Sequence, residues 1–279
     1  MSTKITPLND SAQDLRTRLA DRLLEATGRA QTIPLSCAQQ RLWFLVRLEP
    51  NSPLYNIPCV TRLTGALDIA ALNQALNAIL ARHEILRARI VIRNAEPTQA
   101  FDGEANLQIQ FEDLADHPAS DRGSEMKRWA LAEAKRPFNL DEGRLLRATL
   151  LWLRPEEHVL ILNMHHIISD EWLLKVLFRE LGEFYASFVQ GTPAPLPDLP
   201  IQYGDFAVWQ REWLEGHGFE KQLCFWKEQL SGRPSAIDLP TDRPRQSSRG
   251  SSHGAVQVLP LCGGLSASFH KFANVFSGG

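Results

Sequence analysis

The stretch from His158 to Leu177 reads HVLILNMHHIISDEWLLKVL, and the rest of the chain is best understood outward from it. It begins with an uninterrupted apolar run over residues 159–162, short enough for a buried strand, and continues into a helical pattern. The histidine pair His165 and His166 falls where strand gives way to loop. Adjacent residues on an extended strand point to opposite faces, so both rings cannot line one cavity or hold one metal ion. We expect one histidine to face a cleft and the other to pack inward.

The segments beside this stretch predict a β-hairpin and then an amphipathic helix. Residues 145–153 and 159–164 flank the turn-forming residues 154–157, as in two antiparallel strands. Asp170 stands where the helix begins, and a carboxylate there accepts hydrogen bonds from the first backbone N–H groups. One face of the helix, which we expect to end at Gly191, is apolar. This face carries Trp172, Val176, Leu177, Leu181, Phe184 and Phe188.

Other segments predict a mixed α and β chain. Ser36 and Gln39 form an S-x-x-Q capping box that starts a helix, and Asp68 caps another. The remaining expected elements follow from periodicity and turn residues. They are an amphipathic helix over 10–29, strands over 58–65, 90–92 and 107–111, a helix over 124–135, a proline-rich connector over 193–200, a helical region with mostly buried aromatics over 203–230, a strand over 255–261 and a helix over 270–276.

Composition narrows the function classes. The chain has 279 residues, 44% of them hydrophobic, and a formal charge of −2, which gives no indication of nucleic-acid binding. Its four cysteines form no C-x-x-C pair or metal-ligand spacing, which favours a reducing compartment over a disulfide framework. No run approaches membrane-spanning length, and the first residues lack the apolar core of a signal peptide. We therefore expect a cytoplasmic protein that binds no metal, nucleic acid or membrane.

Four motifs, in order, carry a resemblance to a known family. They read SCAQQRLWFL over 36–45, RHEILR over 82–87, MHHIISD over 164–170 and YGDFAVWQ over 203–210. Together they resemble successive motifs of the condensation domain of nonribosomal peptide synthetases, and the resemblance covers about residues 31–260.

The resemblance implies an α/β fold, an α+β two-layer sandwich of the chloramphenicol acetyltransferase-like, CoA-dependent acyltransferase type. Two such lobes flank a tunnel in that family. Expected segments are an N-terminal helical linker or docking segment over 1–30, a complete first lobe over 31–238, and an inter-lobe linker with the truncated start of the second lobe over 239–279.

The resemblance further implies amide formation between acyl or aminoacyl thioesters on the phosphopantetheine arms of carrier proteins, with no cofactor bound by the chain itself. Expected partners are peptidyl or acyl carrier domains and an adjacent adenylation domain or second lobe. By motif position His166 is the tunnel-facing catalytic residue, while His165 and Asp170 of the same motif are chiefly structural. Arg82 or Arg87 is the expected basic partner of Asp170.

Ser169, Glu171 and Trp172 complete the residues expected to shape the tunnel. The family has glycine after the motif aspartate, whereas this chain has Glu171, which could obstruct a pantetheine arm. Two alternatives therefore stay open beside condensation. One is a stand-alone acyltransferase using a soluble thioester such as coenzyme A, and the other is a non-catalytic remnant that only binds a carrier protein.

Overall fold

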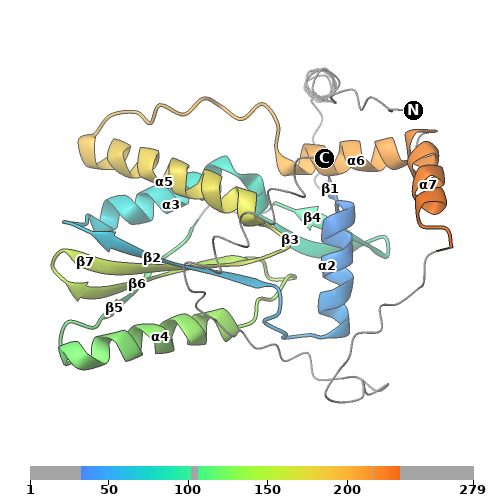
Figure 1. Ribbon diagram of the computed structural model, residues 1–279. Coiled ribbons are helices and arrows are strands. Elements are labelled where there is room, and N and C mark those ends of the chain that lie inside the picture. The colour runs from blue at the N-terminus through green and yellow to red at the C-terminus, as the bar shows by residue number, and fades with distance from the viewer. Residues whose placement is uncertain (1–32, 102–105, 216, 233–279) are drawn as a thin grey trace, which may run out of the picture. The chain divides into compact units, whose positions relative to one another are not determined.

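The computed structural model describes residues 33–101, 106–215 and 217–232 (Figure 1). Contacts between residues divide the chain into units of residues 1–232 and 233–279. The second unit and residues 1–32 lie outside the described residues. The helix expected over 10–29, the elements expected over 255–261 and 270–276, and the segments expected over 1–30 and 239–279 therefore lie there too.

A four-stranded sheet forms the centre of the described unit. Its strand order is β2 (Asn56–Thr64), β7 (Glu157–His165), β6 (Leu146–Arg154) and β5 (Gln110–Asp113). The predicted hairpin is confirmed, because β6 and β7 pair antiparallel, whereas β5 runs parallel to β6. Residues 158–165 of β7 are all buried. A strand covered on both faces needs a continuous apolar run, which explains the sequence of β7.

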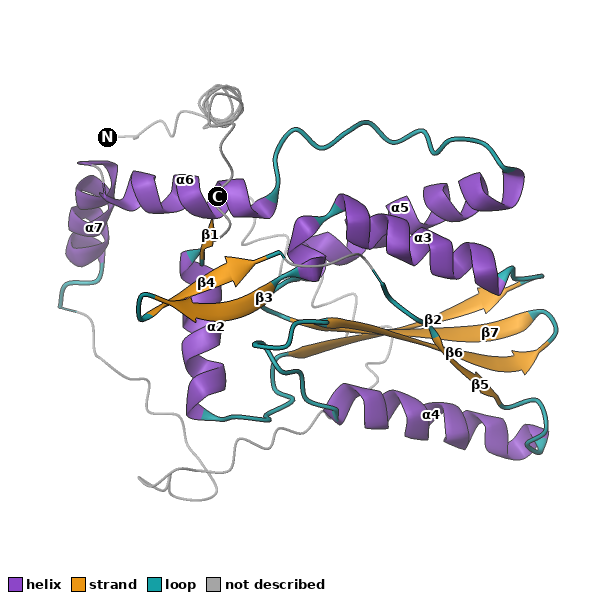
Figure 2. Ribbon diagram, turned by 180° about the vertical axis from the view of Figure 1, so that it is seen from behind, coloured by secondary structure: helices purple, strands orange, loops and turns teal. Residues whose placement is uncertain are grey.

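Helices cover both faces of this sheet (Figures 1 and 2). Helices α3 (Ile69–Arg82) and α5 (Glu171–Gln190) lie on one face, and α4 (Ala119–Lys135) lies on the other. Alternate residues of β7 enter two apolar cores, with Leu162 on the α3 and α5 side and Ile161 on the α4 side. Helix α5 ends as predicted at Gly191, whose φ of 66° suits glycine.

A smaller sheet of three strands lies beside α2 (Cys37–Leu48) in both views (Figures 1 and 2). Its order is β1 (Ile33–Pro34), β4 (Glu96–Ala100) and β3 (Arg89–Arg93), all antiparallel. The capping box predicted for α2 is confirmed, with Ser36 Oγ accepting from Gln39 N–H at 3.2 Å and Gln39 Oε1 accepting from Ser36 N–H at 3.0 Å. This box places α2 directly after β1.

Two elements have other boundaries than predicted, and one strand was not predicted. The strand expected over 107–111 is observed only as β5, and the helix expected over 124–135 begins at Ala119. Pro118 precedes that helix as its N-cap, where a proline needs no backbone N–H. Strand β4 was not predicted, because its sequence EPTQA has weak strand propensity and becomes a strand through pairing with β3 and β1.

A connector without helix or strand over 192–202, as the prolines predict, leads to α6 (Tyr203–Glu215) and then α7 (His217–Gln229). The expectation that the aromatics here are mostly buried was wrong for α7. This helix packs against α6 and leaves four large apolar side chains between 39% and 55% exposed. They are Phe219, Leu223, Phe225 and Trp226. Within the described ranges, no helix combines the length and apolar character needed to cross a membrane.

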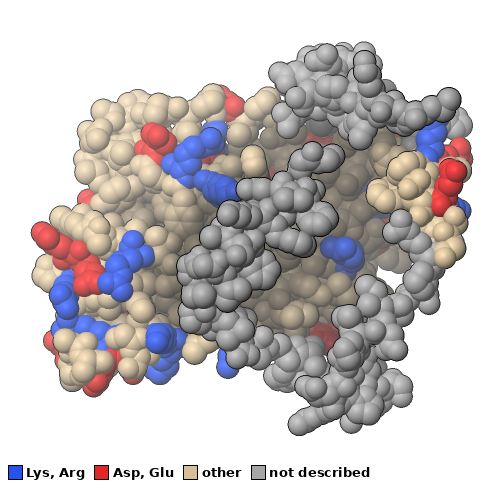
Figure 3. All heavy atoms as spheres, viewed as in Figure 1, with Lys and Arg blue, Asp and Glu red and all other residues tan. Residues whose placement is uncertain are grey.

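Charged side chains gather at the end of the large sheet where β6 turns into β7 and α4 begins (Figure 3). There Glu157 pairs with Arg62 and, at 3.6 Å, with Arg154. The histidine pair lies at the opposite end of β7, since His165 is its last residue. The charged end is therefore separated from the candidate site by the length of the strand.

Candidate active site

A cleft of about 450 Å³ lies between α2, the short 3-10 helix η1 (Glu84–Arg87) and the start of α5. Its walls are largely apolar and include Leu42, Ile85, Ile168, Leu173 and Val176. Polar side chains break this lining at a few points, among them His166, His83, Asp170 and Tyr203. A mostly apolar cleft with a few convergent polar groups is typical of a small-molecule or substrate site.

His166 stands in the loop directly after β7 and presents an exposed ring to this cleft. Its backbone N–H donates to the carbonyl oxygen of Tyr55 at 2.8 Å, and its Nδ1 lies 2.6 Å from the carbonyl oxygen of Ser169. A carbonyl oxygen can only accept, so Nδ1 carries the proton in this contact. Nε2 of the neutral ring is then left as the acceptor.

His165 occupies the opposite environment. Its ring is 2% exposed, lies edge-on to Phe138 at 6.2 Å between centroids, and accepts at Nδ1 from Ile167 N–H at 3.0 Å. Burial, and secondarily the neighbouring His166, lower the pKa of His165 to about 4. The ring is therefore neutral near pH 7, which its acceptor role requires. The opposite orientations of the two rings are those that strand alternation predicts.

Asp170 caps α5, as predicted, by accepting from Leu173 N–H at 2.8 Å. The preceding Ser169 is buried, and its Oγ donates to the carbonyl oxygen of His165 at 3.2 Å. Together these contacts close the turn that carries His166. Ser169 therefore lines the cleft as a buried residue and holds the loop through its carbonyl and hydroxyl groups.

The expected pairing of Asp170 with Arg82 or Arg87 was wrong within the described part of the chain, where Asp170 pairs with neither. Arg82 Nε lies 3.3 Å from the buried carboxylate of Glu180, and Arg87 Nε donates to the carbonyl oxygen of Leu80 at 2.9 Å. Arg82 ends α3, which packs beside α5 at Glu180. Glu180 lies ten positions after Asp170, about 15 Å along the helix axis, so the end of α3 lies beside Glu180 and not beside Asp170.

Trp172 does line the cleft, but its expected place on the packed face of α5 was wrong. The indole is 73% exposed, because it belongs to the first helical turn at the rim of the cleft. Phe188, at the far end of the same helix, is also 40% exposed. Glu171 begins α5, but its side chain lies outside the described residues, so the expected obstruction stays a prediction.

Sequence reasoning gave no cleft-facing role to His83 or Tyr203, although both lie in quoted motifs. His83 Nε2 lies 2.7 Å from a Glu180 oxygen, and the Tyr203 hydroxyl lies 2.9 Å from Ser36 Oγ. Burial raises the pKa of Tyr203, an effect that the hydrogen bond to Ser36 opposes and nearby Asp170 reinforces. A motif identifies such residues but not the direction in which they point. In the described ranges, no cluster of three His, Cys, Asp or Glu side chains could hold a metal ion.

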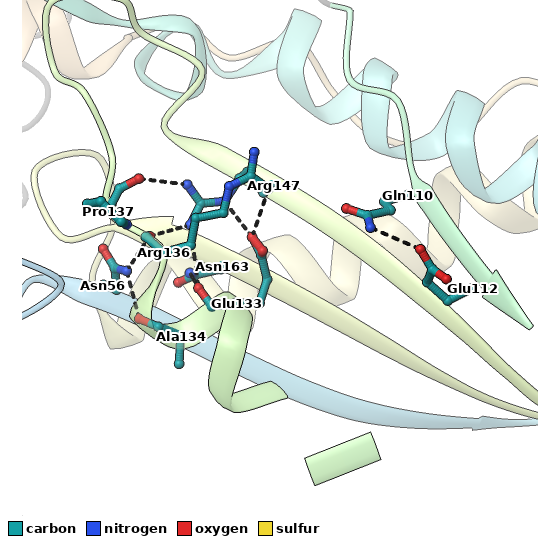
Figure 4. A network of polar contacts seen from close by, with 9 residues as sticks. All are labelled: Asn56, Gln110, Glu112, Glu133, Ala134, Arg136, Pro137, Arg147 and Asn163. Atoms are coloured by element: carbon teal, nitrogen blue, oxygen red, sulfur yellow. Dashed lines mark hydrogen bonds and ion pairs between the residues drawn. The ribbon is translucent and has the colours of Figure 1, made fainter. Parts of the chain in front are cut away.

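A polar network fixes the end of β7 from the α4 side (Figure 4). Asn163, two residues before His165, donates to the carbonyl oxygen of Glu133 at 2.6 Å. Arg147 Nε donates to the Glu133 carboxylate at 2.6 Å, and Asn56 donates to the carbonyl oxygen of Ala134 at 2.8 Å. These bonds satisfy the last carbonyls of α4 and join three strands to one helix end.

Comparison with known proteins gives consistent results. The sequence model of the condensation domain matches residues 29–274. A linear gramicidin synthase protein of Brevibacillus parabrevis is 42% identical over 250 residues, which cover 90% of this chain and 3% of that protein. Malpibaldin synthetase of Mortierella alpina is 39% identical over 237 residues, or 85% of this chain and 4% of that protein. The chain thus spans a small part of these relatives.

Solved structures show the same fold. The starter condensation domain of the rhizomide synthetase RzmA matches with a TM-score of 0.67 and 21% identity, covering 74% of this chain and 49% of that one. A chain from the complex of the X-domain and OxyB from teicoplanin biosynthesis matches with a TM-score of 0.67 and 29% identity, covering 79% and 48%. The fold is therefore of the chloramphenicol acetyltransferase-like α/β type, and the chain spans about half of these solved chains.

Proposed function

This chain belongs to the condensation-domain family, and from that premise we propose that it takes part in forming an amide bond between carrier-bound acyl or aminoacyl thioesters. The observation that carries the proposal is the orientation of the histidine pair. Of the two, only His166 lies in the cleft lining, with Nδ1 held by a carbonyl and Nε2 left to accept, while His165 is buried and neutral.

The proposed step needs little more than one imidazole. The amine nitrogen of the acceptor attacks the thioester carbonyl carbon, the C–S bond breaks, and the pantetheine thiol leaves with the proton that the amine loses. An α-amine with a pKa near ~7.8 is neutral in roughly a third of molecules at pH 7.5, so attack does not require a strong base. His166 Nε2 would orient the amine and pass its proton to the departing sulfur. Such assistance contributes on the order of 10²- to 10⁴-fold, and correct positioning contributes more.

The remaining site residues receive supporting roles in this proposal. Asp170 and Ser169 hold the turn that carries His166, and His165 fixes the loop from behind. Trp172 forms the rim of the substrate passage. Arg82 acts through Glu180 on the packing of α3 against α5. Arg87 supports the end of α3 through its bond to Leu80.

Carrier proteins would deliver both substrates on phosphopantetheine arms, with no cofactor bound by this chain. In the proposed organisation residues 31–238 form the first lobe and residues 239–279 begin the second, with residues 1–30 as a linker or docking segment. An adenylation domain or the second lobe would be the adjacent partner. Two thiol-tethered substrates suit a reducing compartment, which favours the cytoplasm.

A second candidate is binding of a partner without catalysis. One solved relative comes from a two-protein complex, that of an X-domain with OxyB, and Glu171 replaces the glycine of the catalytic motif. In that case the cleft would bind a carrier arm or a partner protein without forming product.

Three parallel assays separate these functions and the free-thioester alternative. The chain, joined to the second half of a condensation domain, is mixed with donor-loaded and acceptor-loaded carrier proteins, and products are measured by mass spectrometry in a single turnover. Amide formation that requires both carriers supports condensation. Acyl transfer from a coenzyme A thioester without carriers would indicate the free-thioester enzyme, and carrier binding without any product would indicate the binding role.

A further inference from the structure

A buried glutamine connects α2 to the loop that carries His166. Gln39 is 2% exposed and lies in the first turn of α2, at a wall of the cleft. Its Nε2 donates to the carbonyl oxygen of Ile167 at 3.2 Å and to Gln99 Oε1 at 3.1 Å. Both protons of the side-chain amide group are thus used, and one of them holds the residue that follows His166.

Gln99 anchors this connection in the small sheet. It is completely buried in β4, the central strand, opposite Ile33 of β1 and Ile90 of β3. Its Nε2 donates to the carbonyl oxygen of Pro34 at 3.0 Å, which leaves Oε1 to accept from Gln39. This series of hydrogen bonds fixes the orientations of the side-chain amides of Gln39 and Gln99. It also connects the small sheet to the loop after β7.

The peptide groups before and after His166 both make hydrogen bonds. The His166 N–H donates to Tyr55, and the Ile167 N–H donates to His165 Nδ1. The Ile167 carbonyl receives the proton of Gln39. Loss of that donor would leave the Ile167 carbonyl without this partner and free the peptide plane between Ile167 and Ile168, the second plane after His166, to rotate.

We propose that Gln39 is a positioning residue for His166, acting by fixing the Ile167 carbonyl and with it the direction of the imidazole into the cleft. This inference rests on the proposed function for its catalytic meaning, but the orientation of the ring is measurable without catalysis. Two side-chain atoms of Gln39 have different roles. Oε1 completes the cap of α2 by accepting from Ser36 N–H, while Nε2 holds the loop.

This division suggests the test variants. Gln39→Glu keeps an acceptor for Ser36 and removes the two donated protons, whereas Gln39→Leu removes both functions. Gln40→Leu is the matched control, because Gln40 follows on the same helix and is exposed. Each variant is compared with the wild type in single-turnover amide formation and in the NMR signals and titration of the His166 ring.

The expected result is that Gln39→Glu lowers the single-turnover rate constant of amide formation about 10- to 100-fold, since small misplacement of a catalytic group costs rates of this order. The carrier-protein concentration that gives half of the maximal rate should stay nearly unchanged. The His166 ring signals should move in both Gln39 variants and stay in place in Gln40→Leu. Unchanged ring signals in a folded Gln39 variant would overturn the inference, whether or not the rate falls. A wild-type protein that forms no amide would instead reject the proposed function, while the ring signals would still decide the role of Gln39.

Discussion

The rings of His165 and His166 are adjacent in sequence but lie in opposite environments, one accepting from Ile167 N–H in the core and the other exposed in the cleft. The buried ring is held neutral, because burial lowers its pKa from 6.5 to about 4. Protonation of the buried ring should therefore cost stability.

Acid should destabilise the fold through His165. The unfolded chain binds a proton on this side chain near pH 6.5 and the folded chain only near pH 4, so stability falls as pH falls between these values. The loss should be about 2 kcal/mol between pH 7 and pH 5 and about 3 kcal/mol once pH is below the folded pKa. Denaturant unfolding of wild type and His165→Asn at both pH values measures it.

Asparagine can place Oδ1 where Nδ1 of His165 accepts, but it does not titrate. His158 is present in both proteins, so its contribution to the pH dependence of stability is the same in both. Burial lowers its pKa too, and both its ring nitrogens lie buried without a hydrogen bond to any residue that the structure describes. Equal pH dependence in wild type and His165→Asn would contradict the assignment of this effect to His165.

The network at the end of α4 should be sensitive to loss of Arg147. Its side chain is 17% exposed and bonds the Glu133 carboxylate, which is 7% exposed, and burial lowers the pKa of Arg147 although Glu133 opposes this. Arg147→Ala leaves the buried Glu133 carboxylate with only the longer contact to Arg136 at 3.7 Å and should cost about 3 kcal/mol in unfolding free energy.

Arg128→Ala is the control for this experiment, because Arg128 pairs with Glu125 on the same helix while 62% exposed. Exposed pairs contribute about 0–1 kcal/mol, so this change should alter stability little. Similar losses of unfolding free energy in Arg147→Ala and Arg128→Ala would show that the network contributes no more to stability than an exposed ion pair.

Asp170 should behave as a helix cap in stability measurements. Asp170→Ala should cost about 1 kcal/mol, as should Asp68→Ala, whose carboxylate caps α3 at 2.9 Å from Ala71 N–H. Asparagine at either position should restore most of the loss, since it also caps well. A cost several times larger at Asp170, not restored by asparagine, would reveal an ion pair that the described structure does not contain.

Glu180 should be a structural requirement for the packing of α3 on α5. Its carboxylate is 2% exposed and contacts Arg82, His83 and, at 3.6 Å, Arg179. Glu180→Gln leaves the partly buried Arg82 without its counter-charge and should cost about 3–5 kcal/mol. Glu183→Gln, at an exposed position three residues later, should change thermal unfolding little. Equal melting temperatures for the two variants would contradict this.

Local signals in the sequence predicted much of this structure. The hairpin around residues 154–157, the caps at Ser36, Asp68 and Asp170, and the opposite directions of His165 and His166 depend on residues close in sequence. Such features follow from periodicity and hydrogen-bonding groups, which a single sequence contains.

Features that depend on distant residues could not be predicted in the same way. Strand β4 exists through its partners, and the ion pair of Arg82 with Glu180 follows from the packing of two helices. Gln39 could be predicted as half of a capping box, but its bonds to Gln99 and Ile167 join positions 60 and 128 residues away. No local pattern specifies such contacts.

The central claim is that one imidazole, that of His166, serves the reaction. His166→Ala and His117→Ala, the latter an exposed histidine in the loop before α4, are compared with wild type in single-turnover amide formation from two loaded carrier proteins. We expect His166→Ala to lower the rate constant at least ~10²-fold with an unchanged melting temperature, while His117→Ala keeps the wild-type rate. Equal amide formation by His166→Ala and wild type would contradict it.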